Sequence, residues 1–449
     1  MCTAAAYQTK DFYFGRNLDY ERTFGESVVI TPRRWALPLR HGPVLETHYA
    51  MIGMAHLRDG FPLYYDAVNE KGLCIAGLNF VDSAVYHPVR EGAENVAQFE
   101  LIPWLLGRCA TLAEARALLT RTNITGTAFC EGLPAARLHW MIADRTGCIA
   151  VESVADGLRV YDDPAGVLAN EPPFPVQLFA LNNYAQLSPE PPVNRFAPSL
   201  PLTAYSRGMG AMGLPGDLSS QSRFVRAAFV RMNAMSGDSE AESLSQLFHI
   251  LGSVEQQRGC CRLDGGECEL TLYTGCCNAD RGVYYYTTYD NSRITAVDMH
   301  RAELDGSVPV SYPLLTGPQI YRQDDPLILH ELPQLHHDAI PQGQRVGSPA
   351  GQTVAVDGQQ LRPVGGAQKM ADQLALAGAA LPHQQLGTAP GLSGSEGVGR
   401  RPQPGIGVLP ADGDVVLLLP VLGAVIPLVH NAVVQHGGIF HGGGAQILG

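Results

Sequence analysis

Lysine is scarce in this 449-residue sequence, and arginine carries almost all of its positive charge. Lysine occurs only at Lys10, Lys71 and Lys369, and the formal net charge at pH 7 is -12. Proteins that bind a nucleic-acid backbone carry clustered basic residues, so this balance argues against a nucleic-acid partner. An acidic balance mostly favours solubility, and it identifies no function by itself.

Targeting segments and long apolar runs are also missing from the first 320 residues. The N-terminal stretch MCTAAAYQTKDFYFGRN has no basic region followed by an apolar core, so we expect no secretory signal. No run of about 18 apolar residues occurs there, so we expect no membrane-spanning helix. The sequence therefore predicts a cytoplasmic protein. Its ten cysteines, all between Cys2 and Cys277, are expected to be reduced thiols.

Spacings that hold metal ions are not found. The adjacent pairs Cys260-Cys261 and Cys276-Cys277 do not have the C-x-x-C spacing of zinc sites. Neighbouring side chains on a strand point to opposite faces, so we expect these cysteines to be small buried residues. Two adjacent histidines in the last third of the chain have no further ligand-type residues at a suitable spacing. Neither a metal ion nor an organic cofactor is expected.

Aromatic residues and cysteine almost vanish after Asp324. Residues 325–449 contain no Cys, Trp or Tyr and a single aromatic residue, Phe440, whereas Gly, Pro, Gln and Ala are abundant. Such a composition buries too little apolar surface to offset the conformational entropy of folding. We therefore predict one folded domain over residues 1–324 and a mostly disordered tail over residues 325–449. The apolar run Val415–Val429 carries two prolines and leaves open a weak membrane or partner contact.

Periodicity in the first 324 residues predicts strands at the start and end, with helices between them. Thr111 and Glu114 form a capping box, which places the beginning of a helix at Thr111. Alternating and β-branched residues predict strands and hairpins, and apolar residues three or four apart predict two further helices. In chain order these are strands 3–9, 11–16 and 27–32, a turn at 69–72, the hairpin 138–154, helices 222–235 and 239–254, and the hairpin 267–290. The arrangement favours an α+β fold with paired sheets covered by helices.

The pair Met1-Cys2 can carry catalytic chemistry. Initiator methionine is removed efficiently before a small residue, so Cys2 is expected to become the N-terminus. One residue then holds both a thiol and an α-amine, part of which is uncharged near neutral pH. The amine can take the thiol proton directly or through a water, so a separate histidine is not needed. On its own, an early cysteine does not establish this chemistry.

The segment GRNLD, residues 15–19, supplies two charged residues that fit such a nucleophile. A strand that starts at Cys2 and turns back through this segment would bring Arg16 and Asp19 beside the N-terminus. Asp19 can then hold the α-amine by a charge-assisted hydrogen bond, and Arg16 can favour the thiolate. By spacing alone, the same two residues also fit an ordinary ion pair at the end of a surface strand.

A series of motifs runs in order along the first 322 residues. It starts with MCTAAAYQTKDFYFGRNLD and VVITPR, and continues through DAVNEKGLCIAGLNF, LHWMIADRTG, GVLANEPPF, GLPGDLSSQSRFVRAAF and GCCNADRGVYYYTTYD. Together these motifs resemble the choloylglycine hydrolase family, which contains bile salt hydrolases and penicillin V acylases. The resemblance implies an N-terminal-nucleophile hydrolase with a four-layer αββα sandwich. Its only self-processing would be loss of the initiator methionine.

The resemblance gives catalytic roles to four residues that carry a thiol or a charge. Cys2 matches the nucleophile, and Arg16 and Asp19 match the charged residues beside the thiol and the amine. Arg223, in SRFVR, matches a second arginine of the active site. By pattern alone, Arg223 would be a surface residue of an amphipathic helix.

Two asparagines complete the catalytic set that the resemblance implies. Asn79, in GLNF, matches an asparagine that bile salt hydrolases have where penicillin V acylases usually have tyrosine. Asn170, in VLAN, matches a donor to the oxyanion, although Ala169 stands where many relatives have threonine. Amide donors aimed at an oxyanion stabilise the transition state by several kcal/mol. The apolar surroundings of Asn79 also argue that this polar side chain has a purpose.

The resemblance implies conjugated bile salts as substrates, in which a rigid apolar steroid carries an amide-linked glycine or taurine. Such a molecule needs an apolar cleft with a few polar groups near the nucleophile. Candidates for the wall, each of which also fits the core, are Leu18, Tyr20, Tyr65, Phe80 and the loop around Cys130–Leu133. Penicillin V acylase or acyl-homoserine-lactone acylase activity stays an alternative, as does a non-enzymatic binding protein. The family also implies a homo-oligomer, a tetramer.

Overall fold

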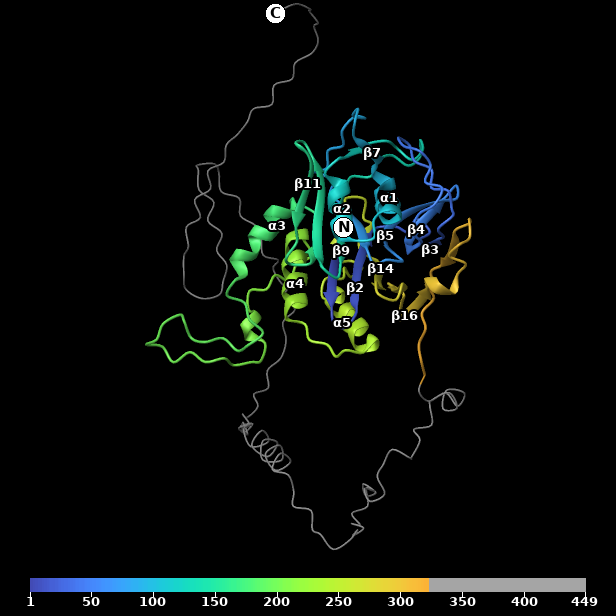
Figure 1. Cartoon of the computed structure of the whole chain (residues 1–449). Coiled ribbons are helices and arrows are strands. Elements are labelled where there is room, and N and C mark those ends of the chain that lie inside the picture. The colour runs from blue at the N-terminus through green and yellow to red at the C-terminus, as the bar shows by residue number, and fades with distance from the viewer. Residues whose placement is uncertain (323–449) are drawn as a thin grey trace, which may run out of the picture. The chain divides into compact units, whose positions relative to one another are not determined.

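Two antiparallel sheets form the centre of the protein in a computed structural model that describes residues 1–322 (Figure 1). The seven-stranded sheet has the order β12 (Val167–Leu168), β1 (Cys2–Gln8), β2 (Phe12–Tyr20), β14 (Cys268–Asn278), β15 (Val283–Thr288) and β16 (Asn291–Asp298), with β13 (Cys261–Arg262) paired to β14. The eight-stranded sheet has the order β11 (Gly157–Asp162), β10 (Gly147–Val154), β9 (Leu138–Asp144), β6 (Cys74–Asn79), β5 (Phe61–Asn69), β4 (Met51–Arg58), β3 (Ser27–Thr31) and β17 (Val310–Pro313). A short parallel pair joins β7 (Glu94–Ala97) and β8 (Thr122–Thr125).

Helices cover the outer face of each sheet. On the seven-stranded sheet, α4 (Ser220–Asn233) and α5 (Glu240–Gly252) pack on β1, and α5 also reaches β2 and β14. The eight-stranded sheet is covered by α1 (Leu101–Arg108) and α2 (Leu112–Leu119). The helix α3 (Phe174–Ala180) lies beside α4. The remaining short helices are η1 (Gln98–Glu100), η2 (Leu181–Tyr184), η3 (Met209–Ala211) and η4 (Met299–Arg301). The layers confirm the predicted αββα sandwich.

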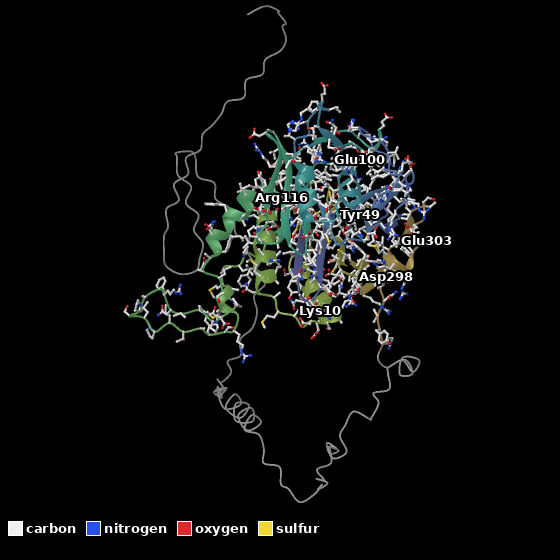
Figure 2. The ribbon with its side chains drawn as sticks, in the orientation of Figure 1. Lys10, Tyr49, Glu100, Arg116, Asp298 and Glu303 are labelled. Carbon is white, nitrogen blue, oxygen red and sulfur yellow. The ribbon has the colours of Figure 1, made fainter. Side chains whose placement is uncertain are left out.

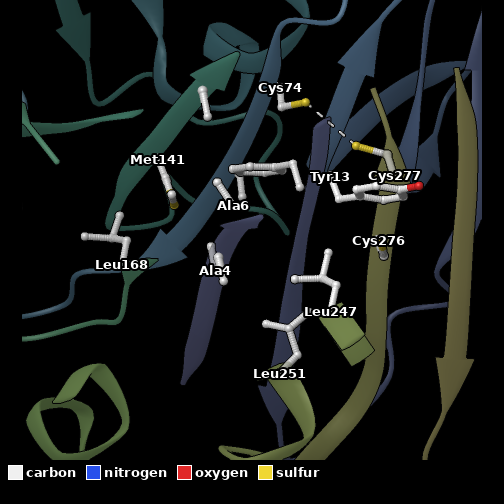
Figure 3. Close-up of a cluster of buried hydrophobic side chains, with 14 of the residues drawn as sticks. Ala4, Ala6, Tyr13, Cys74, Met141, Leu168, Leu247, Leu251, Cys276 and Cys277 are labelled. Carbon is white, nitrogen blue, oxygen red and sulfur yellow. Dashed lines mark hydrogen bonds between the residues drawn. The ribbon is translucent and has the colours of Figure 1, made fainter. Parts of the chain in front are cut away.

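The core between the sheets buries apolar side chains from both of them (Figure 3). Cys74 of β6 and Cys277 of β14 face each other across the gap, with their Sγ atoms 3.7 Å apart. Cys276, the next residue of β14, is also fully buried, on the side toward α5. Because successive side chains of a strand alternate, a strand covered on both faces needs apolar residues at every position. The prediction that Cys276 and Cys277 are buried is therefore confirmed.

The cysteine pair at 260–261 differs from the prediction. Cys260 is exposed and Cys261 is half-buried. The reason is local, because Cys260 ends a turn that begins at Arg258, and Cys261 starts the two-residue strand β13 at the margin of the sheet. The prediction assumed an interior strand, which vicinal cysteines do not specify by themselves.

Local signals located the helices α2, α4 and α5, whereas α1 and α3 were not predicted. Thr111 is the N-cap of α2, and its side chain accepts from the backbone N–H of Glu114, 3.2 Å away, as the capping box predicts. The two helices predicted from periodicity are α4 and α5, each within two residues of its expected limits. The predicted hairpins at 138–154 and 267–290 are β9–β10 and β14–β15. The strand predicted over residues 11–16 was too short, because β2 continues to Tyr20.

Charged side chains such as Lys10 and Glu303 are exposed at the periphery of the described residues (Figure 2). Within residues 1–322, no helix is long and apolar enough to cross a membrane. In the same range, no cluster of three or more His, Cys, Asp or Glu side chains fits a metal ion. The predicted disordered tail, residues 325–449, and its apolar run Val415–Val429 lie outside the described residues.

Candidate active site

Strand β2 positions the site because it lies between β1 and β14 and is buried on both faces. Its side chains alternate, so the residues of GRNLD divide between two environments. Arg16 and Leu18 face the eight-stranded sheet, whereas Asn17 and Asp19 face the helices. Cys2 stands directly opposite Leu18 in the β1–β2 register. The thiol and Arg16 are therefore on one face of the sheet, and Asp19 is on the other.

Cys2 begins strand β1 and is 2% exposed. Met1 precedes it in the described chain, and the Met1 amine donates to the backbone carbonyl of Asp19 and pairs with the Glu269 carboxylate. The backbone N–H of Cys2 donates to Asn170 Oδ1 over 2.8 Å. Removal of Met1 would turn this N–H into an α-amine on the same carbon chain as the thiol. The amine would then lie within reach of Asn170 and of the thiol itself.

Arg16 is fully buried against the thiol. Its Nη2 donates to Cys2 Sγ, and its Nη1 donates to the carbonyls of Gly77 (2.7 Å) and Tyr65 (3.2 Å) in the eight-stranded sheet. Burial lowers the pKa of Arg16, but the neighbouring Cys2, Tyr273 and Asp66 outweigh it and raise that pKa overall. Arg16 therefore stays charged, and a cation in contact with sulfur favours the thiolate.

Asp66 lies behind Arg16 and was not found from the sequence. Tyr273 and Tyr284 donate to its two carboxyl oxygens over 2.8 Å and 2.6 Å. Burial raises the pKa of Asp66, although Arg16 and the two tyrosines act in the opposite direction. No sequence signal marks this residue, because its partners come from β14 and β15, more than 200 positions away.

Asp19 and Arg223 form a buried pair under the N-terminus. Arg223 Nη1 is 3.8 Å from Asp19 Oδ2, and both side chains are fully buried. Thr271 donates to Asp19 Oδ1 (2.6 Å) and Gln256 donates to Oδ2 (3.3 Å). The predicted contact joins the Asp19 carboxylate to the α-amine of mature Cys2. It stays a prediction, because the described chain begins at Met1, whose amine meets the Asp19 carbonyl.

Arg223 also ties the N-terminal strand to Asn170. Its guanidinium donates to the Cys2 carbonyl, to Thr3 Oγ1 and, over 2.7 Å, to Asn170 Oδ1. It comes from the first turn of α4, whose N-terminus points at β1 and β12. Only the family resemblance marked Arg223 from sequence, since an arginine early in an amphipathic helix is ordinarily a surface residue.

Asn170 contacts Asn79, which lines the cavity. Asn170 Nδ2 donates to the Asn79 carbonyl over 2.8 Å, which leaves its second amide hydrogen free for another acceptor. Ser220 accepts from the backbone N–H of Asn170, and Gln177 donates to its carbonyl. Asn79 ends β6, opposite Leu138, and lines the cavity beside Cys2. The two amides can supply uncharged donors to an oxyanion formed near the thiol.

A cavity of about 240 Å³ opens from the thiol, between the two sheets and the neighbouring loops. Of the predicted substrate residues, Leu18, Tyr20 and Tyr65 line it, as does Leu133 of the predicted loop. Aromatic residues that the sequence did not mark complete its wall, namely Phe24, Phe99 and Phe129. Phe99 and Phe129 pack edge-to-face with ring centroids 5.3 Å apart, and the Arg40 guanidinium stacks over both rings. A rigid apolar ligand fits such a wall.

Phe80 is not part of the cavity wall. It is fully buried and stacks on the ring of His139, with centroids 4.3 Å apart and planes 5° from parallel. Its neighbour Asn79 faces the cavity instead, because adjacent residues at a strand end point to opposite sides. The hypothesis that Phe80 contacts substrate is therefore replaced by a packing role. His139 itself is buried and faces Glu152 and the Ala169 carbonyl.

Comparison with known proteins agrees with this geometry. Residues 2–312 match the family described as linear amide C-N hydrolases, choloylglycine hydrolase family. The chain belongs to the choloylglycine hydrolase family. The bile salt hydrolase/transferase of Lactiplantibacillus plantarum is 51% identical over 321 residues, which cover 72% of this chain and 99% of that protein. The bile salt hydrolase/transferase of Clostridium perfringens is 38% identical over 317 residues, covering 70% of this chain and 96% of that protein.

Solved structures place this family member in the same fold. The crystal structure of the C2A mutant of the conjugated bile acid hydrolase from Clostridium perfringens has a TM-score of 0.68 at 36% identity, covering 72% of this chain and 100% of that one. Penicillin V acylase from Agrobacterium tumefaciens has a TM-score of 0.56 at 19% identity, covering 69% of this chain and 90% of that one. At that identity the second likeness shows the fold alone. The chain is thus an amide-hydrolysing enzyme of the choloylglycine hydrolase family.

Proposed function

We propose that this enzyme is a bile salt hydrolase, which cleaves the amide bond between a bile acid and its glycine or taurine. The observation that carries the proposal is the Cys2 thiol, in contact with Arg16 at the end of an apolar cavity rich in aromatic residues. Such a cavity suits a steroid, and the thiol at its end suits the amide of the side chain. The names of the relatives at 51% and 38% identity point to the same substrates.

In the proposed first step, the Cys2 thiolate attacks the amide carbonyl carbon. The thiol proton passes to the α-amine of mature Cys2, and the carbonyl oxygen becomes an oxyanion facing Asn170 and Asn79. Collapse of this intermediate breaks the C–N bond, and the α-ammonium returns its proton to the departing amine of glycine or taurine. The bile acyl group then remains on Cys2 as a thioester.

In the second step, water attacks the thioester carbonyl and loses a proton to the α-amine. Breaking the C–S bond releases the free bile acid and restores the thiolate beside Arg16. Throughout, Arg223 and Asp19 hold the N-terminal strand in place, because Arg223 binds the Cys2 carbonyl and faces Asp19. An amine that reaches the thioester in place of water would give acyl transfer from Cys2 to that amine.

Steady-state assays on taurocholate, glycocholate and penicillin V test the substrate. We expect kcat/KM for the bile salts to exceed that for penicillin V by at least about tenfold, which corresponds to 1.4 kcal/mol of transition-state binding. A value that favours penicillin V would overturn the proposed substrate while leaving the family and the nucleophile unaffected. Binding of bile salts without any turnover would instead support a binding protein.

We also propose that residues 1–324 contain the whole catalytic domain. The relative at 51% identity supports this boundary, because 321 aligned residues cover 99% of its length. A chain truncated after Asp324 should therefore express and turn over bile salts like the full chain. Loss of activity or precipitation of the truncated chain would contradict it. A cytoplasmic location and a homotetramer stay predictions, and light scattering of the purified full chain measures the latter.

A further inference from the structure

Two polar side chains interrupt the apolar wall of the cavity without any role in the proposed reaction. His56 and Gln98 both line the cavity that Cys2 opens into. Neither contacts Cys2, Arg16 or the two asparagines through any hydrogen bond within residues 1–322. Polar groups in an apolar wall are costly unless something binds them, so their partners need to be identified.

His56 lies on β4, directly opposite Leu63 of β5. Its Nδ1 is buried and has no hydrogen-bond partner among the described residues. Tyr65, two residues beyond Leu63, accepts a hydrogen bond from Arg16 through its carbonyl and therefore marks the thiol end of the cavity. The β4–β5 register shifts at Tyr65. His56, opposite Leu63, therefore lies beyond this irregularity, away from the strand position where Arg16 meets the Tyr65 carbonyl.

Gln98 presents a second group of this kind. It belongs to η1, which packs on β5, and only 4% of the residue is exposed. Its side-chain amide makes no hydrogen bond to any other described residue. By contrast, Glu100 of the same short helix is fully used, because it accepts from the backbone N–H groups of Arg40 (2.7 Å) and Ala97 (3.1 Å). An amide offers both donors and an acceptor, so a ligand in the cavity can bind it in either way.

We infer that His56 and Gln98 form a polar subsite that binds a hydroxyl group on the ring system of the acyl half of the substrate. A hydroxyl both donates and accepts, so it suits an imidazole nitrogen as well as an amide. The surrounding rings of Phe99 and Phe129 would hold the apolar faces of the same ring system. The subsite selects hydroxylated steroids over bare ones, because a steroid without the hydroxyl leaves both groups unsatisfied. This inference rests on the proposed bile salt hydrolase function.

The test compares two glycine conjugates that share the same amide, one of cholic acid and one of the ring-unhydroxylated 5β-cholanic acid. The wild-type protein should prefer the cholic acid conjugate in kcat/KM by about tenfold or more, since each unmet polar group costs that order of free energy. His56→Phe and Gln98→Met should each reduce this preference several-fold, mainly by slowing hydrolysis of the hydroxylated substrate. His300→Phe, at an exposed histidine outside the cavity wall, is the matched control and should keep the wild-type preference.

The outcomes separate the subsite from the enzyme's function. Wild-type protein that hydrolyses neither conjugate would overturn the proposed function. Hydrolysis of both conjugates with equal kcat/KM, or variants that slow both substrates by the same factor, would overturn the subsite alone. If His56→Phe does not fold, as judged by circular dichroism, Gln98→Met decides the test, because methionine keeps the length of glutamine and removes only its amide.

Discussion

The two ends of the cavity are built in opposite ways. At the thiol end, Arg16, Arg223 and Asn170 are buried and each makes three or more hydrogen bonds. At the far end, aromatic rings form the wall and only a few polar groups interrupt it. A buried network fixes positions, because any displaced member leaves several groups unsatisfied. An aromatic wall fixes the shape of the cavity, and substitution of a single wall residue can change which ligand the cavity prefers.

The difference indicates how the molecule separates chemistry from substrate choice. Changes at the thiol end should reduce turnover of every substrate, since they disturb the geometry of attack. Changes along the wall should alter the ratio between substrates, since each ring or polar group touches only part of the acyl group. The expected effects therefore fall in size from the nucleophile outward.

Loss of the nucleophile should have the largest effect. Cys2→Ala removes the reacting sulfur, and we expect turnover of glycocholate to fall by at least about 10⁴-fold, by analogy with removal of other catalytic nucleophiles. Cys2→Ser should also be very weak, because a hydroxyl is far harder to deprotonate than a thiol. Cys260→Ala, at an exposed cysteine, is the control and should retain full activity. More than about 1% activity in folded Cys2→Ala would contradict the proposed role.

Arg223→Lys tests the network that holds the N-terminal strand. Lysine keeps the charge but loses the fork that reaches the Cys2 carbonyl and Asn170 together. We expect kcat to fall about 100-fold for every bile salt, with the ratios between substrates unchanged. Arg226→Lys is the matched control, because Arg226 lies on the same helix and donates to Ser253 and Pro215 instead. Equal losses of kcat in the two variants would show that the loss comes from a disturbed helix α4 and not from the lost hydrogen bonds of the Arg223 guanidinium.

Asn79→Tyr probes the boundary between the two ends. Asn79 lines the cavity beside the thiol. The family resemblance implies that penicillin V acylases usually have tyrosine at this position. We expect the ratio of kcat/KM for penicillin V to that for glycocholate to rise by about tenfold. Phe80→Tyr changes the neighbouring buried residue and should leave the ratio close to that of the wild type. An unchanged ratio in Asn79→Tyr would remove position 79 from the determinants of specificity.

The smallest expected effect is a change in the pH dependence of stability, and it comes from Asp163. Unlike Asp19, whose two oxygens both have partners, Asp163 has one carboxyl oxygen bound by the Gly166 N–H (2.8 Å) and one buried without a partner. Burial raises the pKa of Asp163 to about 7, whereas an unfolded Asp titrates near 3.9. Between these values the folded state keeps the proton and the unfolded state loses it. The free energy of unfolding should therefore decrease as pH rises from about 4 to 7.

Asp163→Asn removes this titration. Urea unfolding curves give the difference in the free energy of unfolding between the variant and the wild type. We expect this difference to be roughly 1–3 kcal/mol more favourable to the variant at pH 7 than at pH 4.5. Asp156→Asn, at an exposed carboxylate, is the control and should show no such gain. A parallel pH dependence of the wild type and Asp163→Asn would contradict the raised pKa.

Much of the fold followed from local signals in the sequence. The capping box at Thr111 and the apolar spacing of residues 222–235 and 239–254 specify helices through contacts within a few residues. Strand β2 was predicted too short, because a strand buried on both faces does not alternate between apolar and polar residues. Cys260 was misplaced because it ends a turn before the two-residue strand β13, which adjacent cysteines do not specify by themselves.

The site was predictable only in part. Cys2, Arg16 and Asp19 are close in sequence, so the turn between β1 and β2 brings them together, and the chemistry of the residues marks them. Asn170 and Arg223 come from far along the chain and were identified through the family resemblance alone. Asp66, His56 and Gln98 gave no signal, because their importance arises from partners, or a lack of partners, that only the packed sheets define.

Mass spectrometry of the active protein tests the central claim most directly, which is that mature Cys2 is both the N-terminus and the nucleophile. The intact mass should lack Met1. Brief treatment with iodoacetamide should modify Cys2 in proportion to the loss of activity, as peptide mapping would show, and a bile salt present in excess should slow that modification. Retention of Met1 in a fully active protein, or full turnover after complete modification of Cys2, would contradict the claim.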